Sequence, residues 1–187
     1  MQVIISYLKK KEHQLIVSIA LLAFFLVCTV YDLRDREVPM PLTVGGLVGA
    51  GVYALFVGLW APVLLTIALT HVADFNPREK RLAFGLTLAA FAAIFQPAAT
   101  LICLLILVVW VLWELGVLGG ADVKLIIAAC LVLGNPIFLI PISIVGGVQG
   151  VIASLQKKRE IPFVVSIFCG TLLFVLYPYF SCFLEKV

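Results

Sequence analysis

Charged side chains are scarce in this chain. Only 12% of its 187 residues are Asp, Glu, Lys or Arg, whereas 64% are hydrophobic. A soluble domain of this size covers much of its surface with charged groups, so that it stays hydrated and does not associate. The composition therefore excludes an ordinary water-soluble domain and predicts an integral membrane protein.

Patterns that bind metals or nucleic acids are also missing. The five cysteines all lie singly in apolar runs, with no Cys-x-x-Cys pair, and there are only two histidines. Structural zinc sites are built from such pairs, so we expect no metal and no other cofactor. The net charge of +3 is what the basic loops of a membrane protein produce, and we expect no nucleic-acid partner.

What the chain does contain is long apolar runs. Four stretches hold no Asp, Glu, Lys or Arg, namely residues 38–73, 82–113, 125–156 and 161–184. About 20 apolar residues in a helix cross the hydrocarbon core of a bilayer, so the three longer runs exceed a single span. Each is predicted to fold as a helical hairpin. The turns are expected at Gly58 to Pro62, at Gln96-Pro97 and at Gly134 to Pro136, where glycine and proline interrupt the pattern.

These breaks predict an all-α, polytopic membrane bundle of about eight (six to eight) short transmembrane helices. The whole chain, 1–187, is expected to form one integral membrane domain. The predicted spans are 14–31, 38–57, 60–74, 82–95, 97–115, 123–134, 137–155 and 161–182.

Lysine and arginine placement predicts the orientation. On this map nine basic residues fall on one side of the membrane and four on the other. Cytoplasmic loops carry the excess of Lys and Arg, so the loops after Asp32, around 74–81, around Asp122 and at 156–160 are predicted to be cytoplasmic. The dissenting residues are Lys9, Lys10 and Lys11, ahead of the first span. The expected location is the cytoplasmic membrane, with both aspartates facing the cytoplasm.

Asp32 and Asp122 each lie where a polar loop meets an apolar helix. An ionisable residue at such a place is by default a functional candidate, because the membrane disfavours charge. Two close carboxylates can share a proton, so that one activates water and the other polarises a carbonyl. Small residues in front of Asp122, namely Gly119, Gly120 and Ala121, would let a substrate backbone approach. The structural alternative is that Asp32 ends one helix and Asp122 N-caps another.

Three motifs resemble one known family. Asp32 followed by basic residues and Val38-Pro39 looks like the first aspartate motif of the type IV prepilin peptidases and archaeal preflagellin peptidases. The segment Gly-Gly-Ala-Asp-Val-Lys-Leu at 119–125 is similar to their Gly-x-Gly-Asp-x-Lys-Leu motif. The basic loop before Ile161-Pro162-Phe163 is similar to their entry into the last helix.

This resemblance implies an intramembrane aspartyl endopeptidase with its site at the cytoplasmic face. Asp32 and Asp122 would be catalytic, and Gly119 and Lys124 match further motif positions. The substrate, and expected partner, would be a prepilin-like or preflagellin-like precursor, cut between a short basic leader and an apolar helix; membrane lipid is the other expected partner. The chain lacks the Cys-x-x-Cys region of the bifunctional bacterial enzymes, so only protease activity is expected.

The remaining acidic residues have two interpretations. Glu37 and Glu160 are expected to attract a basic leader, although each would more commonly be a solvated loop charge. Glu114 would either bind the substrate or mark the end of its span.

Two other functions stay open. A presenilin or signal-peptide-peptidase type of protease is suggested by Tyr31-Asp32, although its Pro-Ala-Leu segment is missing. A small carrier would use Asp32 and Asp122 as proton or cation sites.

Overall fold

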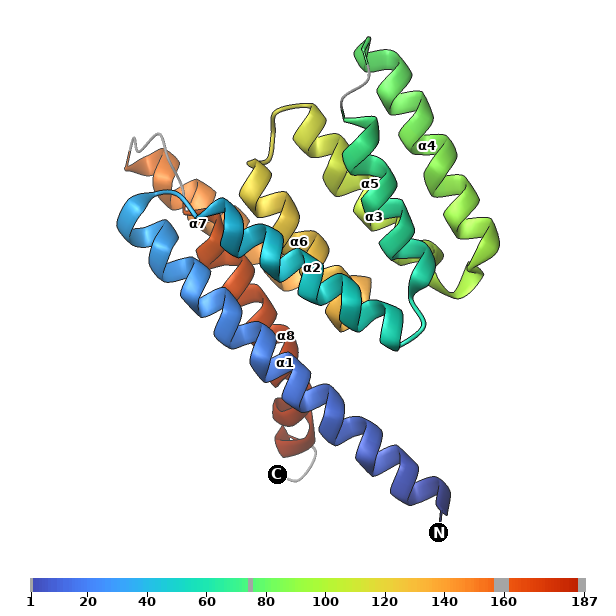
Figure 1. The fold of residues 1–187 in the computed structure, drawn as a ribbon. Helices are drawn as coiled ribbons and strands as arrows, with labels where there is room; N and C mark the ends of the chain where they lie inside the picture. The colour runs from blue at the N-terminus through green and yellow to red at the C-terminus, as the bar shows by residue number, and fades with distance from the viewer. Residues whose placement is uncertain (1, 74–75, 157–161, 185–187) are drawn as a thin grey trace. The chain divides into compact units, whose positions relative to one another are not determined.

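The protein folds almost entirely into helices (Figure 1). The structure, a computed structural model, describes residues 2–73, 76–156 and 162–184, and this part of the chain contains no β-strand. It is built from α1 (Gln2–Asp35), α2 (Met40–Phe56), α3 (Trp60–Val72), α4 (Arg78–Phe95), α5 (Thr100–Glu114), α6 (Gly120–Leu133), α7 (Leu139–Leu155) and α8 (Phe163–Leu184). Short 3₁₀ turns cover Pro97–Ala99 and Pro136–Phe138. The prediction of an all-α chain is confirmed.

The helices end at the positions that the glycine and proline residues predicted as breaks. Gly58 follows α2 with φ of 86°, and Gly134 caps α6 with φ of 61°. A residue with a side chain rarely adopts this left-handed conformation, so glycine there terminates the helix. Gln96 ends α4, and Pro97 opens the next turn. All three predicted breaks between helices are therefore confirmed.

Three helical stretches are long and apolar enough to cross a membrane: His13–Asp35, Pro97–Glu114 and Pro136–Leu155. Shorter apolar helices cover Met40–Phe56, Trp60–Val72 and Phe163–Tyr177. The first helix continues to Asp35, about one turn beyond the end predicted for its span. Asp32 therefore lies inside the last turn of α1 and not in the loop after it.

The chain divides into two compact units. Unit 1 comprises Met1–Val38 and Phe138–Val187, and unit 2 comprises Pro39–Ile137. Unit 1 thus contains α1, α7 and α8, and unit 2 contains α2 to α6. The expectation of one domain over 1–187 stays a prediction.

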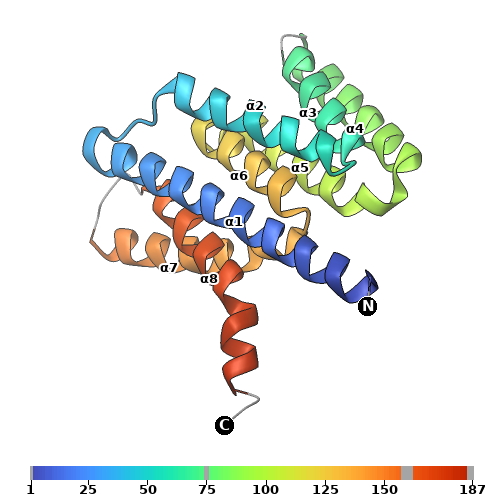
Figure 2. The same cartoon turned by 60° about the horizontal axis from the view of Figure 1, so that its bottom comes forward.

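In unit 1, α8 packs against both α1 and α7 (Figure 2). Phe25 of α1 and Ile167 of α8 are fully buried in this packing. Helices α8 and α7 approach closely at Gly170, where a Cβ atom would lie 2.5 Å from the backbone of Ile142. Small residues allow such close approach between apolar helices.

In unit 2, α6 packs against α2 along its length, while α3, α4 and α5 pack against one another (Figure 1). Nearly every side chain of α6 from Val123 to Leu133 is buried. A helix that is apolar on all sides is stable only when it is surrounded. The first turn of α6, which carries Asp122, is therefore fixed at the start of a well-packed helix.

Candidate functional site

Asp32 is held in the last full turn of α1. Its backbone carbonyl accepts a hydrogen bond from the N–H of Arg36, at 3.2 Å, and Arg36 has a left-handed φ of 58° that ends the helix. The side-chain oxygen Oδ2 of Asp32 is buried and has no hydrogen-bond partner among the described residues. A buried carboxylate oxygen without a partner is rare in folded proteins and needs an explanation.

The start of α8 reaches Asp32. The backbone N–H of Val164, in the first turn of α8, interacts with the Asp32 carboxylate. The N-terminus of a helix carries free N–H groups and a partial positive charge, which favour an anion. Unit 1 therefore brings the first aspartate motif together with the Pro162-Phe163 motif, two segments that are 130 residues apart in the sequence.

The Thr29 hydroxyl lies one helical turn before Asp32. Its Oγ1 atom is also buried and has no partner among the described residues. Residues three apart share a face of a helix, so Thr29 and Asp32 present two under-satisfied polar groups on one side of α1. A water molecule or a polar substrate group would satisfy both.

Asp122 lies in the first turn of α6. The N-cap is Gly119, so the alternative in which Asp122 is itself the N-cap is wrong. Oδ2 of Asp122 lies 3.0 Å from the point where a Cβ atom of Gly119 would be. The carboxylate thus folds back over Gly119, and any larger residue at position 119 would crowd it. A negative charge in a first turn also stabilises the helix, typically by about 0.3–1 kcal/mol.

The loop before Asp122 is turned by Gly116. Gly116 has φ of 75°, and its N–H donates to the carbonyl of Trp113. The N–H of Val117 donates to the carbonyl of Leu112, which completes the two bonds of a Schellman ending for α5. This ending directs the chain from α5 into Gly119 and so fixes where α6 starts.

An ion pair that the sequence did not predict joins three helix ends of unit 2. The guanidinium of Arg81 lies 2.9 Å from Oε2 of Glu114, whose side chain is only 5% exposed. Arg81 also donates to the carbonyl of Ala73, and Arg78 donates to the carbonyl of Glu114. Glu114 thus binds Arg81 and ties the end of α5 to the start of α4.

Removing the charge of Glu114 should destabilise unit 2. In Glu114→Gln the guanidinium of Arg81, whose side chain is 21% exposed, loses its ionised partner, and a hydrogen bond to a charged group is worth about 1.5–3 kcal/mol. We expect a lower unfolding temperature for purified protein in detergent. Glu79→Gln, an exposed position on α4, is the control and should change stability by no more than about 0.5 kcal/mol. Equal melting of the two variants would show that the pair contributes nothing.

The other predicted site residues fall into three groups. Gly120, Ala121 and Lys124 lie with Asp122 in the first turns of α6. Glu37 is exposed in the segment that follows α1 in unit 1. Glu160, with the basic residues before it, lies outside the described residues. In the described part of the chain, no three His, Cys, Asp or Glu side chains come together as metal ligands do.

Comparison with known proteins gives no match. No protein-family model, no curated protein and no solved structure resembles this chain closely enough to be recognised.

Proposed function

We propose that this chain is an intramembrane aspartyl endopeptidase of the cytoplasmic membrane, which removes the short basic leader of prepilin-like or preflagellin-like precursors. The observation that carries the proposal is the hydrogen bonding and burial of the Asp32 carboxylate. Its carboxylate is held by an N–H at the start of α8, yet Oδ2 is buried without a partner. Under-satisfied ionisable groups cluster at functional sites. The motif resemblance around Asp32, Asp122 and Phe163 gives independent support.

The proposed reaction uses Asp32 and Asp122 as a pair that shares one proton. The ionised carboxylate takes a proton from water, and the oxygen of that water attacks the scissile carbonyl. The protonated carboxyl donates a hydrogen bond to the carbonyl oxygen and stabilises its developing charge. The C–N bond then breaks, and the leaving amine takes up a proton. This chemistry requires that the two carboxylates meet during turnover.

Gly119 and Gly120 would contribute space around Asp122. A Cβ atom at position 119 would lie 3.0 Å from Oδ2 of Asp122, so glycine there leaves the carboxylate uncrowded. An extended leader presents unpaired backbone groups, so cleavage belongs at the membrane edge where water is available. We therefore place the cut at the junction of leader and apolar helix, facing the cytoplasm.

Incubation with a synthetic precursor peptide tests the proposal. The purified protein should cut a peptide with a basic leader, a small residue and an apolar helix after the small residue, glycine in the simplest case. Mass spectrometry of the products gives the cut position. Raising the salt from 0.1 to 1 M shortens the Debye length from about 10 to about 3 Å, so it should weaken leader binding and raise KM.

The matched control is the same peptide with its leader lysines and arginines changed to glutamine. It should be cut at the same bond but with a higher KM, because exposed carboxylates such as Glu37 no longer attract it. Cleavage in the middle of the apolar segment, independent of the leader, would favour the presenilin-like alternative. Absence of any cleavage would overturn the proposal.

A further inference from the structure

Two adjoining apolar cavities lie among α2, α3 and α6 in unit 2, and Trp110 and Trp113 of α5 also line the smaller one. Their volumes are about 200 and 390 Å³, and both are lined by Leu47, Thr66, Thr70 and Lys124. The smaller cavity is lined by Gly120 at the start of α6, and the larger cavity is lined by Leu131 near the end of α6. Together they form one groove along α6, the α2–α3–α6 groove, and Lys124 is the one charged residue that lines it.

The groove offers few hydrogen-bond donors to a peptide backbone, namely Nε1 of Trp110, which is buried without a partner among the described residues, and the ammonium of Lys124. The hydroxyl of Thr66 donates to the carbonyl of Pro62 at 2.9 Å, and that of Thr70 donates to the carbonyl of Ile67 at 2.6 Å. An extended peptide here would leave most of its carbonyls unpaired, which is costly in apolar surroundings. The lining therefore disfavours an extended peptide chain. A thin, flexible hydrocarbon chain fits this space, and it has no polar group that needs a partner.

Lys124 adds a charge requirement to this apolar site. Its side chain is half-buried, and no acidic side chain of the described residues forms an ion pair with it. Lys124 lies only about 6 Å along α6 from its start, so its ammonium can extend toward the membrane surface while its stem lines the groove. An occupant with an anionic group at the end of an apolar chain matches both features.

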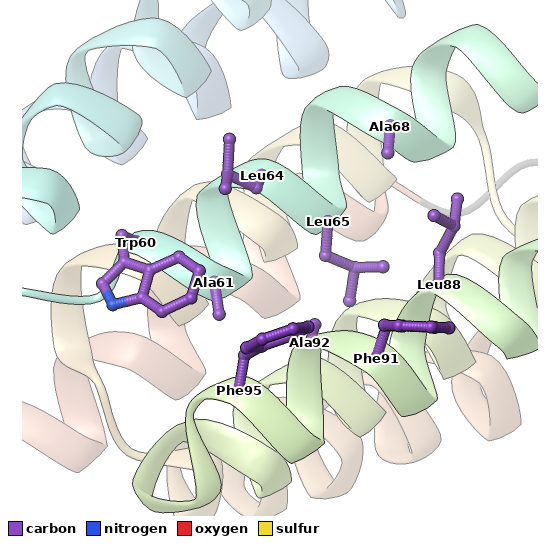
Figure 3. Close-up of a pocket in the computed structure, with 9 residues that line it drawn as sticks. All are labelled: Trp60, Ala61, Leu64, Leu65, Ala68, Leu88, Phe91, Ala92 and Phe95. Atoms are coloured by element: carbon purple, nitrogen blue, oxygen red, sulfur yellow. The ribbon is translucent and has the colours of Figure 1, made fainter.

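A third apolar cavity of unit 2 can be compared with the α2–α3–α6 groove. It holds about 180 Å³ between α3 and α4, where Trp60 and Leu64 face Phe91 and Phe95 (Figure 3). No charged residue lines it, so it has no means of selecting a headgroup.

We propose that the α2–α3–α6 groove binds an acyl chain of an anionic phospholipid, with the lipid phosphate paired to Lys124. Because the site lies beside the first turn of α6, the bound lipid would pack next to the segment that carries Asp122. The proposal concerns lipid binding alone and does not depend on protease activity.

Lipid retention by the purified full chain tests this proposal. The protein is exchanged into detergent with equimolar phosphatidylglycerol and phosphatidylcholine of identical acyl chains, and bound lipid is measured by native mass spectrometry. A lysine near the surface contributes about a fivefold preference for an anionic lipid, so phosphatidylglycerol should be retained about fivefold more. Lys124→Gln should abolish the preference, while glycerol phosphate, which has no acyl chains, should not displace the lipid.

A second experiment fills the groove with a larger side chain. Val52 lines the larger cavity and is 49% exposed, so Val52→Trp should fold and should reduce retention of both lipids at least threefold. Leu101→Trp is the control, because Leu101 is 65% exposed on α5 and lines neither cavity. Equal retention by the two tryptophan variants would overturn the proposal. So would equal binding of the two lipids by the unmodified chain, or displacement of lipid by an uncharged apolar peptide.

Discussion

Changing either Asp32 or Asp122 to asparagine is expected to abolish leader cleavage while the protein stays folded. An amide still forms hydrogen bonds but cannot take a proton from water or share one with a second carboxylate. General acid–base catalysis by a positioned side chain contributes roughly 10²–10⁴-fold, so each variant should lose at least that factor in kcat. The measurement is single-turnover cleavage of the precursor peptide by purified protein, with circular dichroism as the check on folding.

Asp35→Asn is the matched control for Asp32. Asp35 lies on the same helix, one turn beyond Asp32, but its side chain is 53% exposed and lies 3.7 Å from Arg34. Its replacement should leave kcat unchanged, because an exposed pair contributes little. Near-normal turnover in Asp32→Asn or in Asp122→Asn would exclude the two-aspartate mechanism.

The double variant distinguishes a shared mechanism from two separate effects. Residues that act as one unit are strongly non-additive, so the loss of both carboxylates should slow cleavage no more than the loss of one.

A carrier that uses Asp32 and Asp122 as cation sites would give a different result. The unmodified protein would then transport its ion and would not cut the peptide at all.

The sequence predicted the helices well because their ends depend on local chemistry. Gly58 and Gly134 take left-handed conformations that other residues avoid, and Pro97 interrupts the helical hydrogen bonding of the second long run. Such signals act within a few residues and need no knowledge of packing. The predicted end of α1 was less accurate, because the helix continues past the apolar run to Asp35. The residue that ends it with a left-handed conformation, Arg36, is neither glycine nor proline.

Contacts between distant segments were not predictable from the sequence. Arg81 and Glu114 stand 33 residues apart in the sequence, and each looks like an ordinary charge at the end of an apolar run. The hydrogen bond from Ser166 to Gln149 joins α8 to α7 and has no local pattern either. The two candidate aspartates were found because charge is rare in this chain, and Gly119 was found from its place three residues before Asp122. The contact of Val164 with Asp32 is defined only by the fold.

Gly119 gives a physical reason for the glycine that opens the second motif. With a Cβ atom at position 119 only 3.0 Å from Oδ2, the Asp122 carboxylate would have to shift by a few tenths of an ångström from its place over the N-cap. The position of Ala121 carries no such demand, since the motif glycine is replaced there and the helix is regular. The first glycine therefore positions the carboxylate.

Among substitutions that add one methyl group in unit 1, Gly170→Ala should be the most destabilising. The new Cβ atom would lie 2.5 Å from the backbone N and Cα of Ile142, and backbone atoms cannot move aside by changing a rotamer. Helices α7 and α8 would have to separate, and overpacking of this kind costs typically about 1–3 kcal/mol. We expect a clearly lower unfolding temperature, measured with a thiol-reactive dye that reports exposure of buried cysteines such as Cys28.

Gly147→Ala is the matched control on α7. It makes the same chemical change, but nothing lies within 4 Å of its new Cβ atom, and alanine favours a helix over glycine by roughly 0.5–1 kcal/mol. Stability should therefore stay equal or rise. Because α8 also presents the N–H of Val164 to Asp32, Gly170→Ala should slow peptide cleavage even below its unfolding temperature, whereas Gly147→Ala should not. If both variants melt and cleave alike, the close approach of α7 and α8 at Gly170 supports neither the stability of unit 1 nor the placement of Asp32.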